Sequence, residues 1–241
     1  MKRYYYNIII LFMIIVICIL FFKNGINVMK QFFNQKSYNA VVAIDAGHGG
    51  FDPGKIGVNH ALEKDINLSI AYRLKNLLEH NDIKVIMTRN DDNGLYGKWN
   101  QNKKRTDMKK RISIINSNDA FIAVSIHQNS FTQSDSKGAQ VFYYSSSKEG
   151  KELAEIIQDN LKQSIHDGNH RLAKSNNSYF MLKQTDCPLV IVECGFLSNW
   201  EEAKLLCEDS YQERMAWAIH IGIMEYINKF RSENDASAMN Q

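Results

Sequence analysis

Two histidines and two glutamates stand out in this sequence, because each one borders a segment that a folded domain would hold rigidly. His48 and His127 closely follow runs of apolar residues, Glu193 ends a third such run, and Glu63 opens a stretch with helical spacing. Two imidazoles and a carboxylate are a usual ligand set of a catalytic zinc ion, whose fourth position holds a water. His48, Glu63 and His127 supply that set, which predicts a site for one zinc ion.

Glu193 then has a chemical role of its own. Zinc lowers the pKa of a bound water from about 15.7 to near 7, which makes a hydroxide nucleophile available at neutral pH. A glutamate on a rigid buried strand can take the proton of that water and pass it to a leaving amine. The four residues together therefore predict hydrolysis of an amide, with Glu193 as the catalytic residue.

Each of these residues also has a plainer interpretation. His48 lies among glycines and can be a turn histidine without a function. Glu63 can favour a helix amino terminus through the helix dipole, and Glu193 can pair with a lysine. His60 lies three residues before Glu63 and competes with it as a ligand if the helix begins early.

The segments that must position these residues alternate between strands and helices. Apolar runs at 41–44, 120–126 and 189–192 predict buried strands, with further strands at 83–88 and 138–144. Helical spacing predicts helices over 62–80, 107–118, 148–165, 200–207 and 211–230, and the polar stretch 166–178 predicts an exposed loop. We therefore expect an α/β fold of one domain: a mostly parallel twisted sheet with helices on both faces. Ligands of such sheets bind beyond the carboxyl ends of the strands, where His48, His127 and Glu193 emerge.

The amino terminus has a different composition from the rest of the chain. Lys2 and Arg3 precede a continuous apolar run over 8–22, and bulky residues stand where a signal peptidase needs small ones. The pattern predicts a signal-anchor or transmembrane segment over 1–22, a tether over 23–39, a catalytic domain over 40–230 and a disordered tail over 231–241. An extracytoplasmic protein, membrane-anchored or secreted, is the corresponding expectation.

Charge and cysteine content exclude several other classes of protein. Charged residues make up 23% of the 241 and the net charge is +3, so neither an acidic disordered chain nor a strongly basic nucleic-acid binder is indicated. The basic cluster from Lys103 to Arg111 lacks interleaved aromatic residues and is typical of a solvated helix face. Cys187, Cys194 and Cys207 are expected to be mostly buried thiols, and a disulfide between the first two is left open.

Many motifs in this order resemble one family, the zinc-dependent N-acetylmuramoyl-L-alanine amidases, over about residues 40–230. They are Ile44-Asp45-Ala46-Gly47-His48-Gly49-Gly50, Asp52-Pro53-Gly54, Glu63-Lys64-Asp65, Asn67-Leu68, Thr88-Arg89, Arg111, Ser125-Ile126-His127, Asn129, Gly138-Ala139-Gln140-Val141-Phe142 and Val192-Glu193-Cys194-Gly195-Phe196-Leu197-Ser198-Asn199. The resemblance implies a phosphorylase/hydrolase-like fold. It also implies that His48, Glu63 and His127 bind zinc and that Glu193 is the catalytic glutamate. We further expect Asn129, Gly195 and Arg89 to bind substrate.

The family's reaction is cleavage of the amide between the lactyl group of N-acetylmuramic acid and L-alanine of the peptidoglycan stem peptide. Lys55 and Gln128 depart from the small residues usual at these places. The chain looks most like the spore-cortex, germination-specific members, whose amidase step prepares muramic-δ-lactam formation, so a forespore or spore-envelope location is expected. Peptidoglycan, the membrane and a regulatory protein are the expected partners. A zinc peptidase acting on stem peptides and a non-catalytic wall-binding scaffold are the alternatives.

Overall fold

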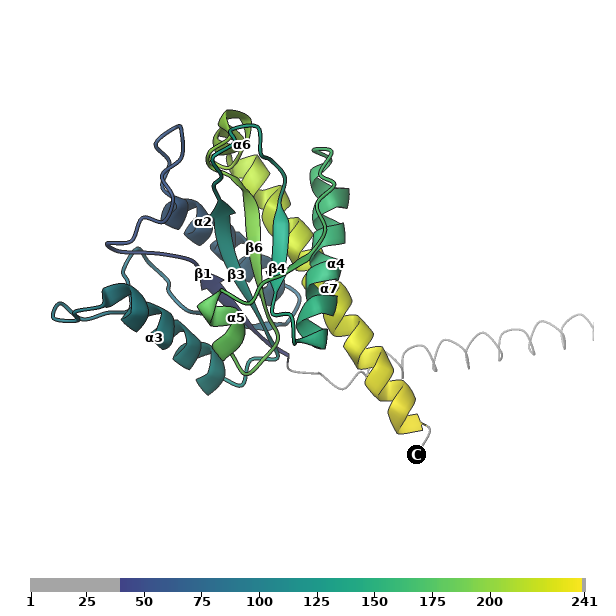
Figure 1. Cartoon of the computed structure of the whole chain (residues 1–241). Helices are drawn as coiled ribbons and strands as arrows, with labels where there is room; N and C mark the ends of the chain where they lie inside the picture. Colours follow the sequence, from purple (N-terminus) through teal and green to yellow (C-terminus); the bar gives the residue numbers. More distant parts are fainter. Residues whose placement is uncertain (1–39, 240–241) are drawn as a thin grey trace, which may run out of the picture. The chain divides into compact units, whose positions relative to one another are not determined.

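Six strands form one sheet in the order β2-β1-β3-β6-β4-β5 in the computed structural model, which describes residues 40–239 (Figure 1). The strands are β1 (Val41–Ala46), β2 (Lys84–Met87), β3 (Ile122–Asn129), β4 (Gln140–Tyr143), β5 (Lys174–Ser175) and β6 (Leu189–Phe196). β2, β1, β3 and β6 are mutually parallel, β4 runs antiparallel to β6, and β5 is parallel to β4. The prediction of an α/β fold with a mostly parallel sheet is confirmed.

Helices cover both faces of this sheet (Figure 1). They are α2 (Glu63–Glu79), α3 (Lys103–Ser117), α4 (Lys148–Ile165), α5 (Phe180–Gln184), α6 (Trp200–Leu205) and α7 (Asp209–Met239). Side chains alternate between the faces of β1, so Val42 and Ile44 join the core under α2, α4 and α7, whereas Ala43 joins the core under α3 and α5. Burial of β1 on both faces explains why its first four residues are all apolar.

The helix α4 shows how closely a strong pattern can fix an element. Its bounds, Lys148–Ile165, are those that the spacing predicts. Ser147 caps the helix by accepting a hydrogen bond from Gly150 N at 2.9 Å, and buried Leu153, Ile157 and Leu161 share one face.

Two regions differ from the prediction. The polar stretch expected to be only a loop contains β5, and α5 follows it with Met181 and Leu182 buried. The spacing predicts that the last helix ends at Phe230 before a disordered tail over 231–241, but α7 continues to Met239. No glycine or proline interrupts that segment, and two alanines in it favour the helix.

The predicted signal-anchor over 1–22 and the tether over 23–39 lie outside the described residues. Within residues 40–239, no helix is long and apolar enough to cross a membrane. Cys187, Cys194 and Cys207 are free thiols, so the disulfide left open between Cys187 and Cys194 is not formed. Cys194 is buried as expected, whereas Cys207 is exposed.

Candidate active site

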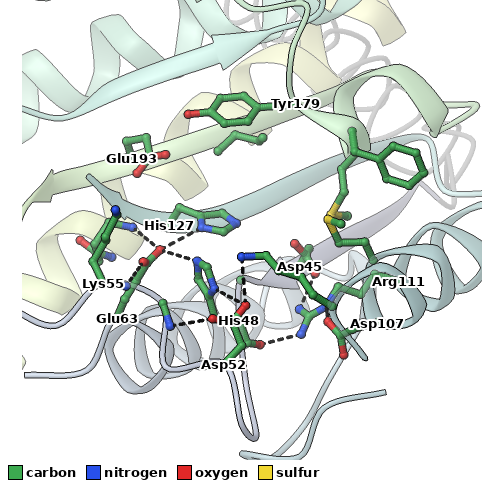
Figure 2. Close-up of a pocket in the computed structure, with 18 of the residues that line it drawn as sticks. Asp45, His48, Asp52, Lys55, Glu63, Asp107, Arg111, His127, Tyr179 and Glu193 are labelled. Atoms are coloured by element: carbon green, nitrogen blue, oxygen red, sulfur yellow. Dashed lines mark hydrogen bonds and ion pairs between the residues drawn. The ribbon is translucent and has the colours of Figure 1, made fainter. Parts of the chain in front are cut away.

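The carboxyl ends of three parallel strands open into one cavity of about 520 Å³. His48 follows β1, His127 lies near the end of β3, and Glu193 lies in β6, where it is paired in register with His127. Glu63 is the first residue of α2. All four side chains line the cavity, and Figure 2 shows them gathered around one point.

Three of these side chains form a compact cluster of metal-ligating atoms, which we call the His48–Glu63–His127 cluster. Glu63 Oε1 lies 3.2 Å from His48 Nε2 and 2.9 Å from His127 Nδ1. One ligating atom from each residue lies within 4.8 Å of the others. Ligands that hold zinc tetrahedrally at about 2.0–2.1 Å are about 3.3 Å apart, so the two contacts to Glu63 have the spacing of zinc ligands.

Glycines make room for this cluster. A Cβ atom on Gly47 would overlap the His127 ring, and one on Gly54 would overlap the Glu63 side chain. Gly54 also has a φ of +69°, a backbone conformation that residues with a side chain rarely adopt. The glycine-rich loop after β1 is therefore required by the approach of two ligands to its backbone.

Asp52 orients the first ligand. Its Oδ2 lies 3.1 Å from His48 Nδ1, on the opposite side of the ring from the nitrogen that faces Glu63. When a carboxylate accepts a hydrogen bond from the Nδ1–H of a histidine, Nε2 is left available for a metal. This arrangement is usual for metal-binding histidines. The Asp52 contact therefore assigns Nε2 of His48 as the ligating atom.

Beneath the loop lies a buried ion pair that fastens its backbone. Asp45 and Arg111 are 1% and 2% exposed and are joined by a contact of 2.9 Å between Oδ1 and Nη1. Arg111 also donates to the carbonyl oxygens of Ala46 and His48, both at 2.6 Å. Burial alone would raise the pKa of Asp45, but the charge of Arg111 and hydrogen bonds from the Ser125 and Thr88 hydroxyls lower it to about 2. The prediction that the basic cluster is a solvated helix face is wrong for Arg111, because its guanidinium is needed under the loop.

The electrostatics of the cluster favour a bound cation. Burial alone would raise the pKa of Glu63, but its hydrogen bonds with His127 and His48 lower it well below the ordinary value. Burial alone would lower the pKa of His127, but the hydrogen bond and charge of Glu63 raise it to about 9. A carboxylate this firmly ionised between two imidazoles attracts positive charge, which either a proton or a metal ion can supply.

Glu193 has the opposite environment. It is 8% exposed, burial raises its pKa, and its Oε2 has no hydrogen-bond partner among residues 40–239. The hydroxyl of Tyr179 points toward its carboxylate from across the cavity (Figure 2). A carboxylate whose pKa is raised above its ordinary value is suited both to accept a proton and to return it.

Only one of the three residues predicted to bind substrate lines the cavity. Asn129 lines the cavity. Arg89 does not: it is 3% exposed and its guanidinium donates to the carbonyls of Ala46, Gly47, Lys64 and Asp91. Gly195 lies against Leu206 and Glu202 rather than in the cavity. Arg89 and Gly195 therefore contact the scaffold rather than the cavity, and substrate binding by these two residues and by Asn129 stays a prediction.

The structure also decides the competition between His60 and Glu63. His60 is exposed, adopts a φ of 66°, and is not part of the cluster, because α2 begins at Glu63 rather than earlier. Tyr179, Lys104 and Asp52 also line the cavity, but the sequence patterns did not identify any of them as a site residue. Asp52 had a signal, its position four residues after His48 in the glycine loop, whereas Tyr179 lies in a loop without a pattern.

Comparison with known proteins points to one family. The sequence profile Amidase_3, described as N-acetylmuramoyl-L-alanine amidase, matches residues 42–225. The germination-specific N-acetylmuramoyl-L-alanine amidase of Bacillus subtilis (strain 168) is 35% identical over 192 residues, which cover 78% of this chain and 80% of that protein.

Solved structures agree with this match. The CwlD amidase from Clostridioides difficile, solved in complex with the GerS lipoprotein, superposes with a TM-score of 0.76 at 43% identity, covering 79% of this chain and 99% of that one. The catalytic domain of CwlV, an amidase from Bacillus (Paenibacillus) polymyxa var. colistinus, superposes with a TM-score of 0.69 at 29% identity, covering 78% of this chain and 98% of that one.

Proposed function

The chain belongs to the Amidase_3 family and is a peptidoglycan N-acetylmuramoyl-L-alanine amidase, and from that premise we propose that it works with one zinc ion and in the spore cortex. The observation that carries the zinc proposal is the convergence of His48, Glu63 and His127 within 4.8 Å beside the buried Glu193. The reaction is hydrolysis of the amide between the lactyl group of N-acetylmuramic acid and L-alanine.

In this proposal the ligands are His48 Nε2, His127 Nδ1 and a carboxylate oxygen of Glu63. A zinc ion held by these residues would polarise the scissile carbonyl and would lower the pKa of a bound water toward 7. Asp52 holds the His48 ring in the required tautomer, and Arg111 holds the backbone carbonyl of His48.

Glu193 moves the proton. Its carboxylate accepts one proton from the attacking water as the new carbon–oxygen bond forms, and it returns that proton to the alanine nitrogen as the carbon–nitrogen bond breaks. The products are a lactyl carboxylate and a free amine on the peptide. Tyr179, Phe180 and Met181 line the same cavity as this carboxylate, which is itself only 8% exposed.

The biological setting is a further part of the proposal. Likeness to the germination-specific amidase of B. subtilis and to CwlD supports a role in the spore cortex, where removal of the stem peptide prepares muramic-δ-lactam formation. The apolar run over 8–22 supports an extracytoplasmic protein held at the membrane, with the tether over 23–39 before the catalytic domain. The CwlD structure contains the GerS lipoprotein, and we propose that a protein partner likewise controls the location or metal loading of this chain.

Mass spectrometry of digested muropeptides tests the proposed function. The full-length chain in mild detergent, loaded with zinc, should release intact stem peptides that begin with L-alanine, and a chelator should stop the release until zinc is restored. Shortened peptides still attached to the sugar would instead indicate a zinc peptidase. Release that continues unchanged in the chelator would contradict the zinc requirement while leaving the amidase activity in place.

A further inference from the structure

Glu193 needs a neighbour that holds its carboxylate in place. The described residues leave its buried Oε2 without a hydrogen-bond partner. A buried carboxylate with few donors is costly and is free to turn, because no directed bond opposes rotation. The ligands beside it are engaged elsewhere: His48 directs Nε2 to Glu63 and Nδ1 to Asp52, and His127 directs Nδ1 to Glu63.

Tyr179 is placed to supply it. The residue lies directly before α5, lines the same cavity, and directs its hydroxyl toward Glu193 (Figure 2). Its ring packs edge-on against Phe142, with ring centroids 5.7 Å apart and an interplanar angle of 86°. Asn176 Oδ1 fixes the turn by accepting hydrogen bonds from Tyr179 N at 3.1 Å and Ser178 N at 2.7 Å.

The hydroxyl of Tyr179 remains a donor at working pH. Burial, followed by the charge of the Glu193 carboxylate, raises the pKa of Tyr179 to about 12. A neutral phenol keeps its hydrogen and offers it to an ionised carboxylate, and hydrogen bonds to charged groups are among the stronger ones in proteins.

We propose that Tyr179 is a positioning residue for Glu193: its hydroxyl donates a hydrogen bond to the carboxylate and holds it toward the His48–Glu63–His127 cluster. The inference rests on the proposed role of Glu193 in proton transfer. Tyr179 acts through Glu193, so its hydroxyl matters for turnover rather than for substrate affinity or for zinc. Removal of the hydroxyl should therefore lower kcat and leave KM and the zinc dissociation constant unchanged.

A double-mutant cycle on the zinc-loaded full-length chain tests this inference. Tyr179→Phe keeps the ring and its packing on Phe142, and we expect kcat to fall about 10-fold or more, as for loss of a hydrogen bond to a charged group. In a Glu193→Gln background the same change should alter kcat by less than about 2-fold, because effects that pass through one residue are not additive. Zinc affinity, measured by competition with a chromophoric chelator, should stay constant in both variants.

Tyr144→Phe is the matched control, because Tyr144 packs against the same core as Tyr179 but does not line the cavity. It should retain wild-type kcat. Equal losses from Tyr179→Phe in the wild-type and Glu193→Gln backgrounds would overturn the positioning role, as would an unchanged kcat in Tyr179→Phe. Full activity of Glu193→Gln alone would instead contradict the proposed function, so the two failures are distinguishable.

Discussion

Two buried glutamates share one cavity, and the protein surrounds them in opposite ways. Glu63 contacts His48 Nε2 and His127 Nδ1, and it accepts hydrogen bonds from Gln128 N at 3.1 Å and Lys55 N at 2.7 Å. Glu193 has one oxygen with no partner among the described residues. The pKa of Glu63 is lowered and that of Glu193 is raised, although both are the same residue type and almost fully buried.

The contrast separates two tasks. A carboxylate that is held ionised from several sides suits permanent contact with a cation, whereas a carboxylate with few donors and a raised pKa suits repeated gain and loss of a proton. The difference extends into the scaffold, because the loop that carries His48 is fastened by Arg111 and Asp52. On the other side, Tyr179 is the neighbour that directs a hydroxyl toward Glu193 (Figure 2). Each of the following changes tests one side of this comparison.

Glu193→Gln should have the largest effect. Glutamine keeps the size of the side chain but cannot carry the proton, and loss of general acid–base catalysis costs about 10²–10⁴-fold in rate. Release of stem peptides from muropeptides measures kcat, and circular dichroism checks that the fold is intact. Activity within a few-fold of the wild type would show that Glu193 does not transfer the proton.

Arg111→Ala should be the most damaging change to stability. It leaves Asp45 and Asp107 as buried or partly buried charges without their guanidinium, and breaking a buried pair costs about 3–5 kcal/mol. Urea unfolding measures the loss. Lys110→Ala, at an exposed neighbouring position on the same helix, should change the free energy of unfolding by less than about 0.5 kcal/mol. Equal free energies of unfolding for the two variants would show that the buried Asp45–Arg111 pair does not stabilise the fold.

Asp52→Asn should weaken zinc binding without preventing the fold. The amide no longer fixes the His48 tautomer as a carboxylate does, and loss of such a partner costs about 10–100-fold in metal affinity. Chelator competition measures the dissociation constant. Asp159→Asn, which changes an exposed carboxylate paired with Lys162, serves as the control and should bind zinc like the wild type.

Asp45→Asn should reveal a pH-dependent contribution to stability. The pKa of Asp45 is about 2 in the folded chain and near 3.8 when unfolded, so its stabilisation is complete above about pH 4 and is lost as the pH falls through 2. The gap in unfolding free energy between the wild type and Asp45→Asn should narrow by about 2 kcal/mol from pH 6 to pH 2. A gap that stays constant or widens on acidification would contradict the lowered pKa.

Sequence patterns predict the positions of those site residues that lie at the ends of buried strands. An apolar run that ends on a histidine or glutamate specifies a place at the sheet edge, which is why the amino-acid sequence alone suffices to group His48, His127 and Glu193. Glu63 follows from the start of a strongly periodic helix. These residues are far apart in the sequence, but they come together because the strands and the helix that carry them must bury their apolar side chains.

The misplaced residues depend on local geometry that a sequence does not display. Arg89 is positively charged, as many substrate-binding residues are, but its guanidinium donates hydrogen bonds to the carbonyl oxygens of Ala46 and Gly47. The helix α5 spans only Phe180–Gln184, too short for a periodic signal, and it is stabilised by burial of Met181 and Leu182. Tyr179 could not be found without α5, because its aim toward Glu193 depends on where that short helix begins.

The most direct test of the central claim is the zinc content of Glu63→Gln and Glu193→Gln, purified side by side and measured together with their turnover. We expect Glu193→Gln to keep one zinc ion per chain while losing turnover, and Glu63→Gln to lose zinc and turnover together. Zinc retained at full occupancy in Glu63→Gln, or lost to the same extent from both variants, would contradict the assignment of one glutamate to the metal and the other to the proton.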